Sequence, residues 1–557
     1  MVRNRTVAGV PADLAIILRD VGTLLLMQAG LMVLTVGVAL VFGEFYPALG
    51  FLTAGGVTAA VGGGCRRMFA DAPDPKMKHG MVIAAGGWFA TAAFGALAFF
   101  LAAWMTPESV MDGFVPAATD TSEWSVVTAG GLATKSSLGY FRNPLHAMFE
   151  SMSGWTGSGL TMAIHEPSLP RSVQWWRSLI QYVGGVGVIV LTVSILSRPG
   201  SGSYALYRSE AREEKIHPSV VSTVRTVWKI FVGYTVLSIL ALFVAIWWSE
   251  SYPVGEALWQ AINHAMTGLS TGGFSVTDNS MESYNSPLIE GVLLPVMTLG
   301  AIAFPIHYAI LSNGRWRKLT EDLQTRWLFI ILAAGIVVLS AQNVLVGLAP
   351  AGYGATVGSP VGTLSTAQFD AIRDGTFQWV SALSCTGFQS SPIGRWSDGG
   401  KLLLAGAMTL GGAAGSTVGG IKIVRGYTVS KGIQWQFARV FLPSKAVVNV
   451  NLDGRTLNRE EMDREFAEAA IVSLLWILLL LATSFVLVNV AGNDFSYADA
   501  LFEVASAQGN VGLSTGITGP NMPVLAEAMF LLNMWVGRLE IIPVLVFFRS
   551  TLKGLNP

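Results

Sequence analysis

Thr156-Gly-Ser-Gly159-Leu-Thr161 is the first of four short stretches that decide the fold. The other three read Ser270-Thr-Gly-Gly273-Phe-Ser275, Ser384-Cys-Thr-Gly387-Phe-Gln389 and Gly509-Asn-Val-Gly512-Leu-Ser514. In each, a glycine precedes Leu or Phe and then a small or amide polar residue. The aligned glycines lie 114, 114 and 125 residues apart. A period of this size, with one such loop in each copy, indicates a duplicated domain rather than a solenoid.

Each of these four glycine loops follows a short helical pattern and precedes an apolar run. The patterns are Met148-Phe149-Glu150-Ser151, Leu258-Trp259-Gln260-Ala261, Phe377-Gln378-Trp379-Val380 and Leu501-Phe502-Glu503-Val504. One match would mean little in a chain with 62 glycines, because glycine in membrane helices usually permits close packing. Four matches in register favour one shared role.

The composition is that of a membrane protein. Of 557 residues, 52% are hydrophobic and 13% charged, and mean hydropathy is +0.53; a soluble protein carries about 25% charged residues. Residues 80–104 and 470–492 contain no charge, and about 20 apolar residues cross a bilayer as a helix. A net charge of zero gives no reason to expect nucleic acid, and two cysteines are too few for a disulfide framework or a cysteine metal site.

Ten spans are predicted, and the basic residues orient them. Their cores are 23–43, 47–64, 80–104, 175–197, 227–249, 287–312, 327–349, 400–421, 466–491 and 524–548. The connections assigned to the inside, 1–22, 65–79, 198–229, 313–326, 422–464 and 549–557, hold 27 of the 35 Lys and Arg residues. Because basic residues accumulate in cytoplasmic loops, both termini are expected in the cytoplasm of a cell (inner) membrane protein.

The glycine loops lie in outside connections that contain half-apolar stretches too short or too polar to span, at 143–160, 255–274, 367–388 and 496–513. Irregular backbone at membrane depth is tolerated only beside protein or a water-filled cavity. We therefore expect an all-α polytopic membrane protein with four tandem helix, pore helix, filter loop, helix repeats around one pore. The expected units are two N-terminal spans (1–79) and repeats at 80–198, 199–313, 314–426 and 427–557.

Glycine is suited to an ion filter. Potassium filters replace the hydration shell with rings of backbone carbonyls, and glycine reaches positive φ without steric cost. The four short motifs hold no carboxylate, which a calcium-type filter would be expected to show. The predicted potassium-binding residues are Gly157, Ser158, Gly159, Thr271, Gly272, Gly273, Cys385, Thr386, Gly387, Asn510, Val511 and Gly512.

The loops resemble those of the Trk/Ktr/HKT superfamily of potassium transporters. Gly411-Gly-Ala-Ala-Gly-Ser-Thr-Val-Gly-Gly-Ile-Lys422 and Gly537-Arg-Leu-Glu540 also match, and the two extra N-terminal spans resemble the Trk branch, with its TrkH-like membrane subunits. The resemblance implies potassium uptake through one filter, with potassium as the transported ligand and no covalent cofactor. The chain departs from many relatives at Gly157-Ser158, where they carry threonines, and at Cys385.

A gate is predicted from the glycines between 405 and 420, at 406, 411, 412, 415, 419 and 420. Each Gly costs a helix about 1 kcal/mol relative to Ala, so we expect an intramembrane loop below the filter; a glycine-rich packing face is the alternative. The predicted gate residues are Gly411, Gly412, Gly415, Gly419, Gly420 and Arg538. Arg538 is expected to face the cavity, or else to bond carbonyls for structure, and Glu540 is on a different helix face.

The resemblance also implies partners. A cytosolic RCK-type (TrkA-like) nucleotide-binding ring is expected to dock on 422–464, and the membrane subunit is expected to be a homodimer. A four-repeat voltage-gated channel would need arginine rows, which the spans lack. An alternating-access transporter uses inverted repeats, whereas these four run in one direction. An intramembrane hydrolase is disfavoured because no Ser-His constellation stands out, so we expect no enzyme. Coupling of potassium to sodium or protons is left open.

Overall fold

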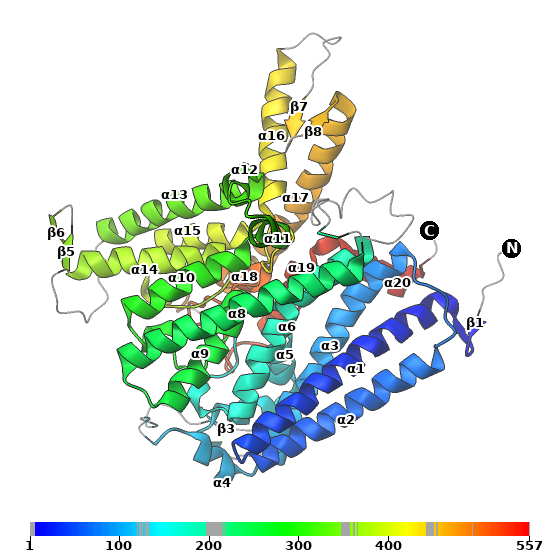
Figure 1. Cartoon of the computed structure of the whole chain (residues 1–557), viewed down its shortest axis with the longest axis vertical. Coiled ribbons are helices and arrows are strands. Elements are labelled where there is room, and N and C mark those ends of the chain that lie inside the picture. The colour runs from blue at the N-terminus through cyan, green and yellow to red at the C-terminus, as the bar shows by residue number, and fades with distance from the viewer. Residues whose placement is uncertain are drawn as a thin grey trace.

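A computed structural model of the chain is predominantly helical (Figure 1). It describes the chain apart from residues 1–5, 118, 120, 122–125, 128–132, 197–215, 218, 347–356, 360–361, 365, 442–449, 453–454, 493 and 556–557. Much of the predicted inside segment 198–229, and part of the predicted docking segment 422–464, therefore lies outside the described residues.

Two N-terminal helices precede four units of similar order. These helices are α1 (Ala12–Val41) and α2 (Phe45–Met68). The first unit contains α3 (Met77–Met105), α4 (Glu108–Met111), α5 (Pro144–Thr156) and α6 (Arg171–Leu196). The second contains α8 (Val220–Glu250), α9 (Val254–Leu269), α10 (Pro287–Ala301) and α11 (Phe304–Asn313).

The last two units also place a shorter helix after a long one. The third contains α12 (Lys318–Glu321), α13 (Leu323–Val346), α14 (Thr366–Leu383), α15 (Asp398–Thr409) and α16 (Ile423–Val440). The fourth contains α17 (Arg459–Val490), α18 (Tyr497–Gly509), α19 (Val524–Leu539) and α20 (Ile541–Lys553). The 3₁₀ turns are η1 (Asp112–Phe114), η2 (Ser137–Arg142), η3 (Glu166–Ser168), η4 (Ser280–Ser283) and η5 (Ile393–Arg395).

The strands form small antiparallel hairpins at the ends of helices. They pair β1 (Thr6–Val7) with β2 (Val10–Pro11), β3 (Val126–Val127) with β4 (Ala133–Thr134), β5 (Val357–Ser359) with β6 (Gly362–Leu364), and β7 (Val450–Leu452) with β8 (Arg455–Leu457). None of these hairpins joins another in a larger sheet among the described residues, so helix packing builds the core.

Among the described residues, six helices are long and apolar enough to cross a membrane, or eight if two bent pairs each count as one span. Two of the predicted spans are bent, and a third contains the loop that its glycines predicted. The span predicted over 287–312 bends at Ile302–Ala303, where α10 and α11 meet at 104°. Pro305, at the start of α11, lacks the N–H that would continue the helix.

The span predicted over 524–548 breaks at Glu540, where α19 and α20 meet at 114°. Glu540 has φ of 58°, a left-handed value that is uncommon for residues other than glycine. The span predicted over 400–421 is helical only as far as Thr409, and residues 410–422 run as an irregular loop before α16. The glycine-rich segment is therefore not a helix face.

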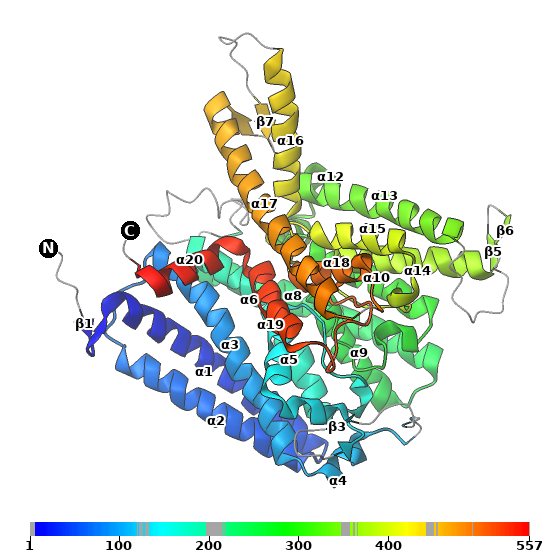
Figure 2. The ribbon, with the colours of Figure 1, turned by 180° about the vertical axis from the view of Figure 1, so that it is seen from behind.

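The arrangement places the short helices inside the bundle. In Figure 1 and Figure 2, α1 and α2 lie side by side along one flank and pack against α3, while α5 and α18 are enclosed by longer helices. Both chain ends lie on the same side of the bundle. The α16 helix and the first half of α17 project beyond the other helices on either side of β7 and β8.

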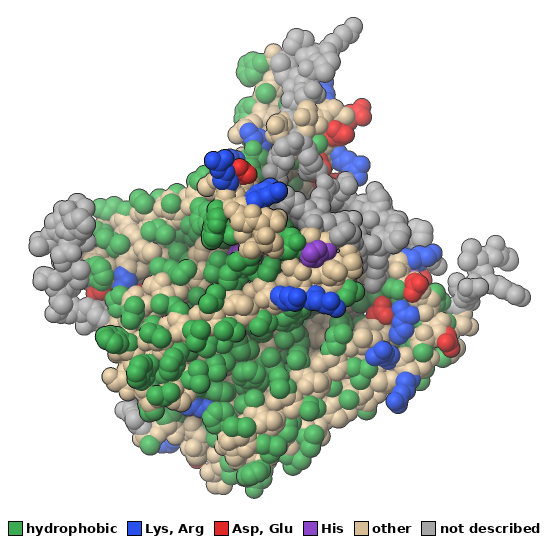
Figure 3. Space-filling view, viewed as in Figure 1, with side chains coloured by type: hydrophobic (Ala, Val, Ile, Leu, Met, Phe, Trp, Pro, Cys, Tyr) green, Lys and Arg blue, Asp and Glu red, His purple; other side chains and the backbone are tan. Residues whose placement is uncertain are grey.

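The surface matches a membrane environment. Figure 3 shows hydrophobic side chains covering the face along α8, while Lys and Arg gather toward its edges. On α8 itself, Leu237 is 63% exposed and Leu240 is 58% exposed. Large apolar side chains with such exposure are stable against lipid, whereas in water they would form an unusually large patch.

Candidate functional site

The glycine of each repeat lies at the tip of the loop that follows a short helix. Gly159, Gly273, Gly387 and Gly512, the ring glycines, have φ of 78°, 77°, 81° and 108°. Left-handed backbone of this kind favours glycine because a Cβ would clash with the chain. The four short helices α5, α9, α14 and α18 therefore end in the same kind of turn.

The ring glycines form a closed ring. A Cβ built on Gly159 would lie 2.3 Å from the Gly272 oxygen, and one on Gly273 would lie 2.1 Å from the Thr386 oxygen. The third loop contacts the fourth in the same way, and the fourth contacts the first.

A Cβ on Gly387 would lie 1.8 Å from the Val511 oxygen, and one on Gly512 would lie 2.7 Å from the Ser158 oxygen. Each glycine thus packs against the carbonyl that precedes the next ring glycine. The structure brings the four loops, and with them all twelve predicted filter residues, into one place.

The residues two positions before the ring glycines share a second feature. These entry residues, Gly157, Thr271, Cys385 and Asn510, have φ of 70°, 53°, 50° and 54°. Three of them are not glycine, so three of the four loops place a residue with a side chain in the left-handed region, which such residues rarely adopt. Such strain persists only where the surrounding structure imposes it.

A recurring backbone hydrogen bond helps to impose this turn. The N–H just before each ring glycine donates to a carbonyl five residues earlier in the short helix, at 2.8–2.9 Å. The pairs are Ser158 with Ser153, Gly272 with Thr267, Thr386 with Ser381, and Val511 with Ser506. The accepting residue is Ser or Thr in every repeat. This regularity is visible in the sequence but was not part of the motif described above.

A side chain nine residues before each ring glycine anchors the chain that leaves the ring. We call Glu150, His264, Gln378 and Glu503 the anchor residues. Glu150 accepts from Thr161 Oγ1 at 2.9 Å and from the Met162 N–H at 2.9 Å. It is fully buried and also pairs with Arg177 at 2.7 Å.

The other three anchors act at equivalent positions with different chemistry. His264 Nε2 accepts from the Val276 N–H at 3.2 Å, and Gln378 Nε2 donates to Ser390 Oγ at 3.2 Å. Glu503 is fully buried. It accepts hydrogen bonds from the Ser514 hydroxyl, from the N–H and hydroxyl of Thr515, and from the Thr518 N–H.

The second loop has an additional clamp from α6. Gln181 is fully buried; its Nε2 donates to the Gly272 carbonyl at 2.6 Å, and its Oε1 accepts from the Phe274 N–H at 3.0 Å. These bonds hold both sides of Gly273. Arg177, one α6 turn earlier, donates to the Ser275 carbonyl at 2.8 Å. The first repeat thereby positions the loop of the second.

The Gly-rich loop, residues 410–422, has ends that nearly touch. The Gly411 N–H donates to the Ile421 carbonyl at 2.8 Å, and the Ile421 N–H donates to Thr409 at 3.0 Å. A Cβ on Gly420 would lie 2.9 Å from the Gly411 nitrogen. A compact loop with adjacent ends is typical of an Ω-loop.

The Gly-rich loop packs against the inner ends of the glycine loops and the break between α10 and α11. A Cβ on Gly419 would lie 2.3 Å from the Gly509 oxygen, and one on Gly412 would lie 3.1 Å from the Ala301 oxygen. Gly415 has φ of 77°, and its carbonyl accepts from the Phe304 N–H at 3.1 Å. The predicted gate glycines thus lie together beside the ring.

Arg538 joins the Gly-rich loop to α6. It is 5% exposed, and its Nη1 donates to the Thr417 carbonyl at 2.5 Å. Its Nη2 donates to the carbonyls of Gly184 at 3.0 Å and Gly185 at 3.2 Å. Arg538 therefore bonds carbonyls, as its structural interpretation expects, and contacts the loop, as its gating interpretation expects.

Glu540 pairs with Arg425 rather than with Arg538. The Arg425 Nη1 to Glu540 Oε2 distance is 2.6 Å, and both side chains are buried. Since Arg425 begins α16 and Glu540 separates α19 from α20, this pair ties the helix after the Gly-rich loop to the break in the last span. Arg425 is not among the gate residues that the sequence predicts.

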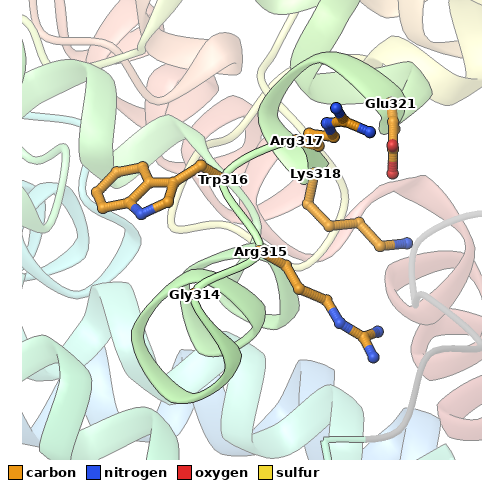
Figure 4. Close-up of a pocket in the computed structure, with 6 residues that line it drawn as sticks. All are labelled: Gly314, Arg315, Trp316, Arg317, Lys318 and Glu321. Atoms are coloured by element: carbon orange, nitrogen blue, oxygen red, sulfur yellow. The ribbon is translucent and has the colours of Figure 1, made fainter.

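A separate hollow lies at the turn between α11 and α13 (Figure 4). It is lined by Gly314, Arg315, Trp316, Arg317, Lys318 and Glu321. The Trp316 side chain points away from those of Arg315 and Lys318. Its residues belong to the predicted inside segment 313–326, and none is among the predicted site residues.

The comparisons with known proteins cover most of the chain. The sequence model of the TrkH family, described as a cation transport protein, matches residues 79–554. An uncharacterized cation transporter of Methanocaldococcus jannaschii is 33% identical over 422 residues, covering 76% of this chain and 79% of that protein. The Trk system potassium uptake protein TrkH of Escherichia coli is 29% identical over 416 residues, covering 73% and 78%.

A solved structure has the same fold. The crystal structure of the potassium transporter TrkH from Vibrio parahaemolyticus superposes with a TM-score of 0.74, at 23% sequence identity. The alignment covers 97% of this chain and 99% of that chain. The two N-terminal helices and the four repeats therefore belong to one shared architecture.

Proposed function

This chain belongs to the TrkH family of cation transport proteins, and from that premise we propose that it takes up potassium across the cell membrane through a filter formed by the four glycine loops. The observation that carries the proposal is the closed ring of left-handed glycines, each packed against the carbonyl of the next loop. The E. coli relative is named as a potassium uptake protein. We propose transport without enzymatic catalysis.

Two features of the ring support a monovalent cation as the ligand. The short helices α5, α9, α14 and α18 all end at the ring, so the partial negative charges of four helix C-termini converge there. The loops themselves carry no carboxylate. Carbonyl oxygens and helix ends replace hydration water without a fixed full charge, which suits potassium, since binding must be weak enough for release.

The Gly-rich loop is proposed as the gate. It contacts the inner side of two glycine loops, through Thr417 at Thr271 and through Gly419 at Gly509. Arg538 holds the same loop and brings a positive charge close to it. A buried cation repels potassium strongly in a low-dielectric pathway, so movement of loop and arginine together would open the path.

The family also suggests regulation from the cytoplasm. We propose that a nucleotide-binding subunit of RCK type docks on the projecting α16 and α17, in a homodimer of membrane subunits with cytoplasmic termini. Helix α16 begins where the Gly-rich loop ends. A partner that displaces α16 would pull directly on that loop.

Flux into proteoliposomes tests this function. The purified chain is reconstituted alone into vesicles that hold more potassium inside than outside. Outward movement of potassium makes the interior negative, so external ⁸⁶Rb⁺ should accumulate inside, and external potassium should compete with it better than sodium does. Uptake that requires an imposed sodium or proton gradient would identify a coupled transporter instead. Absence of flux from correctly folded, inserted protein, with and without cytosolic extract, would contradict the proposal.

A further inference from the structure

The entry residues meet the Gly-rich loop and its arginine on one face. Thr271 Oγ1 lies 2.9 Å from Thr417 Oγ1, and a Cβ on Gly419 would lie 3.0 Å from Asn510 Oδ1. Cys385, the entry residue of the third loop, is fully buried. A Cβ on Gly157 would lie 3.8 Å from Arg538 Nη1.

Thr417 is the residue through which most of this contact passes. Its N–H donates to the Gly300 carbonyl at 3.2 Å, and its carbonyl accepts from Arg538. Its hydroxyl donates to the Gly300 carbonyl at 3.0 Å. Either hydroxyl can be the donor in the bond between Thr271 and Thr417, and Thr417 continues this contact to the Gly300 carbonyl.

We propose that the hydrogen bond between Thr271 and Thr417 is a latch that holds the Gly-rich loop against the entry residues, and that its release exposes Cys385 from the side of that loop. The inference rests on the proposed function in assigning the loop to the gate. It adds which residues hold that gate closed. The bond joins the second repeat to the third, at a distance of 146 residues along the chain.

The chemistry of this contact suits a switch. The loss of one neutral hydrogen bond shifts an opening equilibrium by roughly twofold to thirteenfold. Backbone bonds at Gly300 and the arginine would remain. The latch therefore biases the loop toward the closed position without making opening prohibitive.

Cys385 supplies a native reporter of the loop position. Its side chain is fully buried, and Cys65 on α2 is the other cysteine of the chain. A Cys65→Ser background leaves Cys385 as the single thiol. A charged methanethiosulfonate reagent is too large to pass a potassium filter, so it should reach Cys385 only when the loop has moved.

The experiment measures the rate of Cys385 modification by intact mass in the full-length purified protein. Thr271→Val and Thr417→Val should each accelerate modification by roughly fivefold, whereas Thr271→Ser, which keeps the hydroxyl, should not. Thr428→Val is the matched control, because Thr428 is also buried and, among the described residues, its hydroxyl bonds only the Val424 carbonyl of its own helix. The double variant, Thr271→Val with Thr417→Val, should be modified at the same rate as Thr417→Val alone.

The outcomes separate the latch from the gate. Unchanged modification in both Val variants overturns the latch, and Thr417→Val tests the same bond from the loop if Thr271→Val fails to fold. Acceleration equal to that of Thr428→Val also overturns it. Faster modification with unchanged ⁸⁶Rb⁺ flux supports the latch but contradicts the proposed gate. Faster modification of Thr417→Val, with raised flux and an unchanged potassium preference, supports both.

Discussion

The ring glycines have no room for a side chain, and the contacts differ in severity around the ring. A Cβ would approach backbone oxygen to 1.8 Å at Gly387 but only to 2.7 Å at Gly512. Because the obstructing atoms are backbone, relief requires one loop to move relative to the next. Substitution should therefore disturb the carbonyl that packs on the glycine, in proportion to the overlap.

We predict that Gly387→Ser and Gly273→Ser weaken the preference for potassium over sodium most, and Gly512→Ser least. The measurement is ⁸⁶Rb⁺ flux with sodium as competitor, per folded protein. Gly291→Ser is the control, since a Cβ at this α10 position meets no atom of the described residues within 4 Å outside the backbone of its own helix. Unchanged preference in all ring variants would remove these glycines from the filter.

The buried anchors give a second prediction at this scale. Glu503→Gln replaces an acceptor of several hydrogen bonds with a group that also presents N–H donors to them. Losing hydrogen bonds to a charged group costs about 1.5–3 kcal/mol, so the melting temperature should fall by several degrees and potassium preference should decline.

Glu460→Gln, at an exposed position of α17, should leave both properties unchanged in the same thermal unfolding and flux assays. A Glu503→Gln protein with wild-type melting temperature and selectivity would show that the anchor does not hold the fourth loop.

The sequence predicted the ring glycines because each repeat needs the same left-handed backbone. It did not predict the anchors. Glu150, His264, Gln378 and Glu503 share a position but not a chemistry, so side-chain type carries no common signal. The spacing of nine residues was available in the aligned motifs, but only the folded loop shows that this position faces the departing chain. Thr417 was likewise hidden within a glycine-rich motif.

At the scale of elements, composition predicts one of the three helix breaks and does not predict the other two. Glycine content indicated a loop near 405–420, and the structure places it at 410–422, because residues 405–409 continue α15. The breaks at Ile302–Ala303 and Glu540 were missed, since both lie in apolar runs that hydropathy alone treats as continuous. Pro305 near the first break is a weak signal within a long apolar run, and the left-handed backbone of Glu540 at the second break leaves no signal in the sequence.

The near contact between Gly411 and Gly420 allows a clean test of the gate. Deleting residues 412–419 should let these glycines join across one peptide, which spans 3.8 Å between Cα atoms. We predict higher ⁸⁶Rb⁺ flux with an unchanged ion preference, because the ring lies elsewhere in the chain. Lower flux from folded protein would instead indicate that the loop is packing only.

Arg538→Ala should also raise flux, because it removes a buried positive charge and a bond to the loop. Arg538→Lys keeps the charge and should lie closer to the wild type. Combined with the deletion, Arg538→Ala should add little, since coupled residues are non-additive. Fully additive effects on flux would show that arginine and loop are separate barriers.

For the whole molecule, the period of the glycine motif and the two preceding spans predicted the architecture that the structure shares with a solved TrkH. The projection of α16 and α17 was not foreseen, because the segment 422–464 is basic and was treated as a connection. Two of its aromatic side chains are strongly exposed: Phe437 is 70% exposed and Phe441 is 86% exposed. Phe437 lies in α16 and Phe441 is its C-cap, and α16 projects beyond the other helices (Figure 1).

We predict that the chain purifies from its native membrane as a homodimer of 59.2 kDa subunits with a soluble nucleotide-binding subunit attached. Phe437→Ser with Phe441→Ser should release that subunit while leaving selectivity intact, as measured by light scattering and mass spectrometry. Monomers without a co-purifying subunit would contradict both the dimer and the docking surface.

The central claim is that the four ring glycines surround one potassium site, and ion density tests it most directly. Crystals of the full chain grown in rubidium and measured at the rubidium absorption edge should show an anomalous peak on the axis between Gly159, Gly273, Gly387 and Gly512. The peak should diminish when potassium replaces rubidium, and in Gly387→Ser. Protein that conducts ⁸⁶Rb⁺ yet shows no density within this ring, with the ion bound elsewhere along the path, would contradict the account.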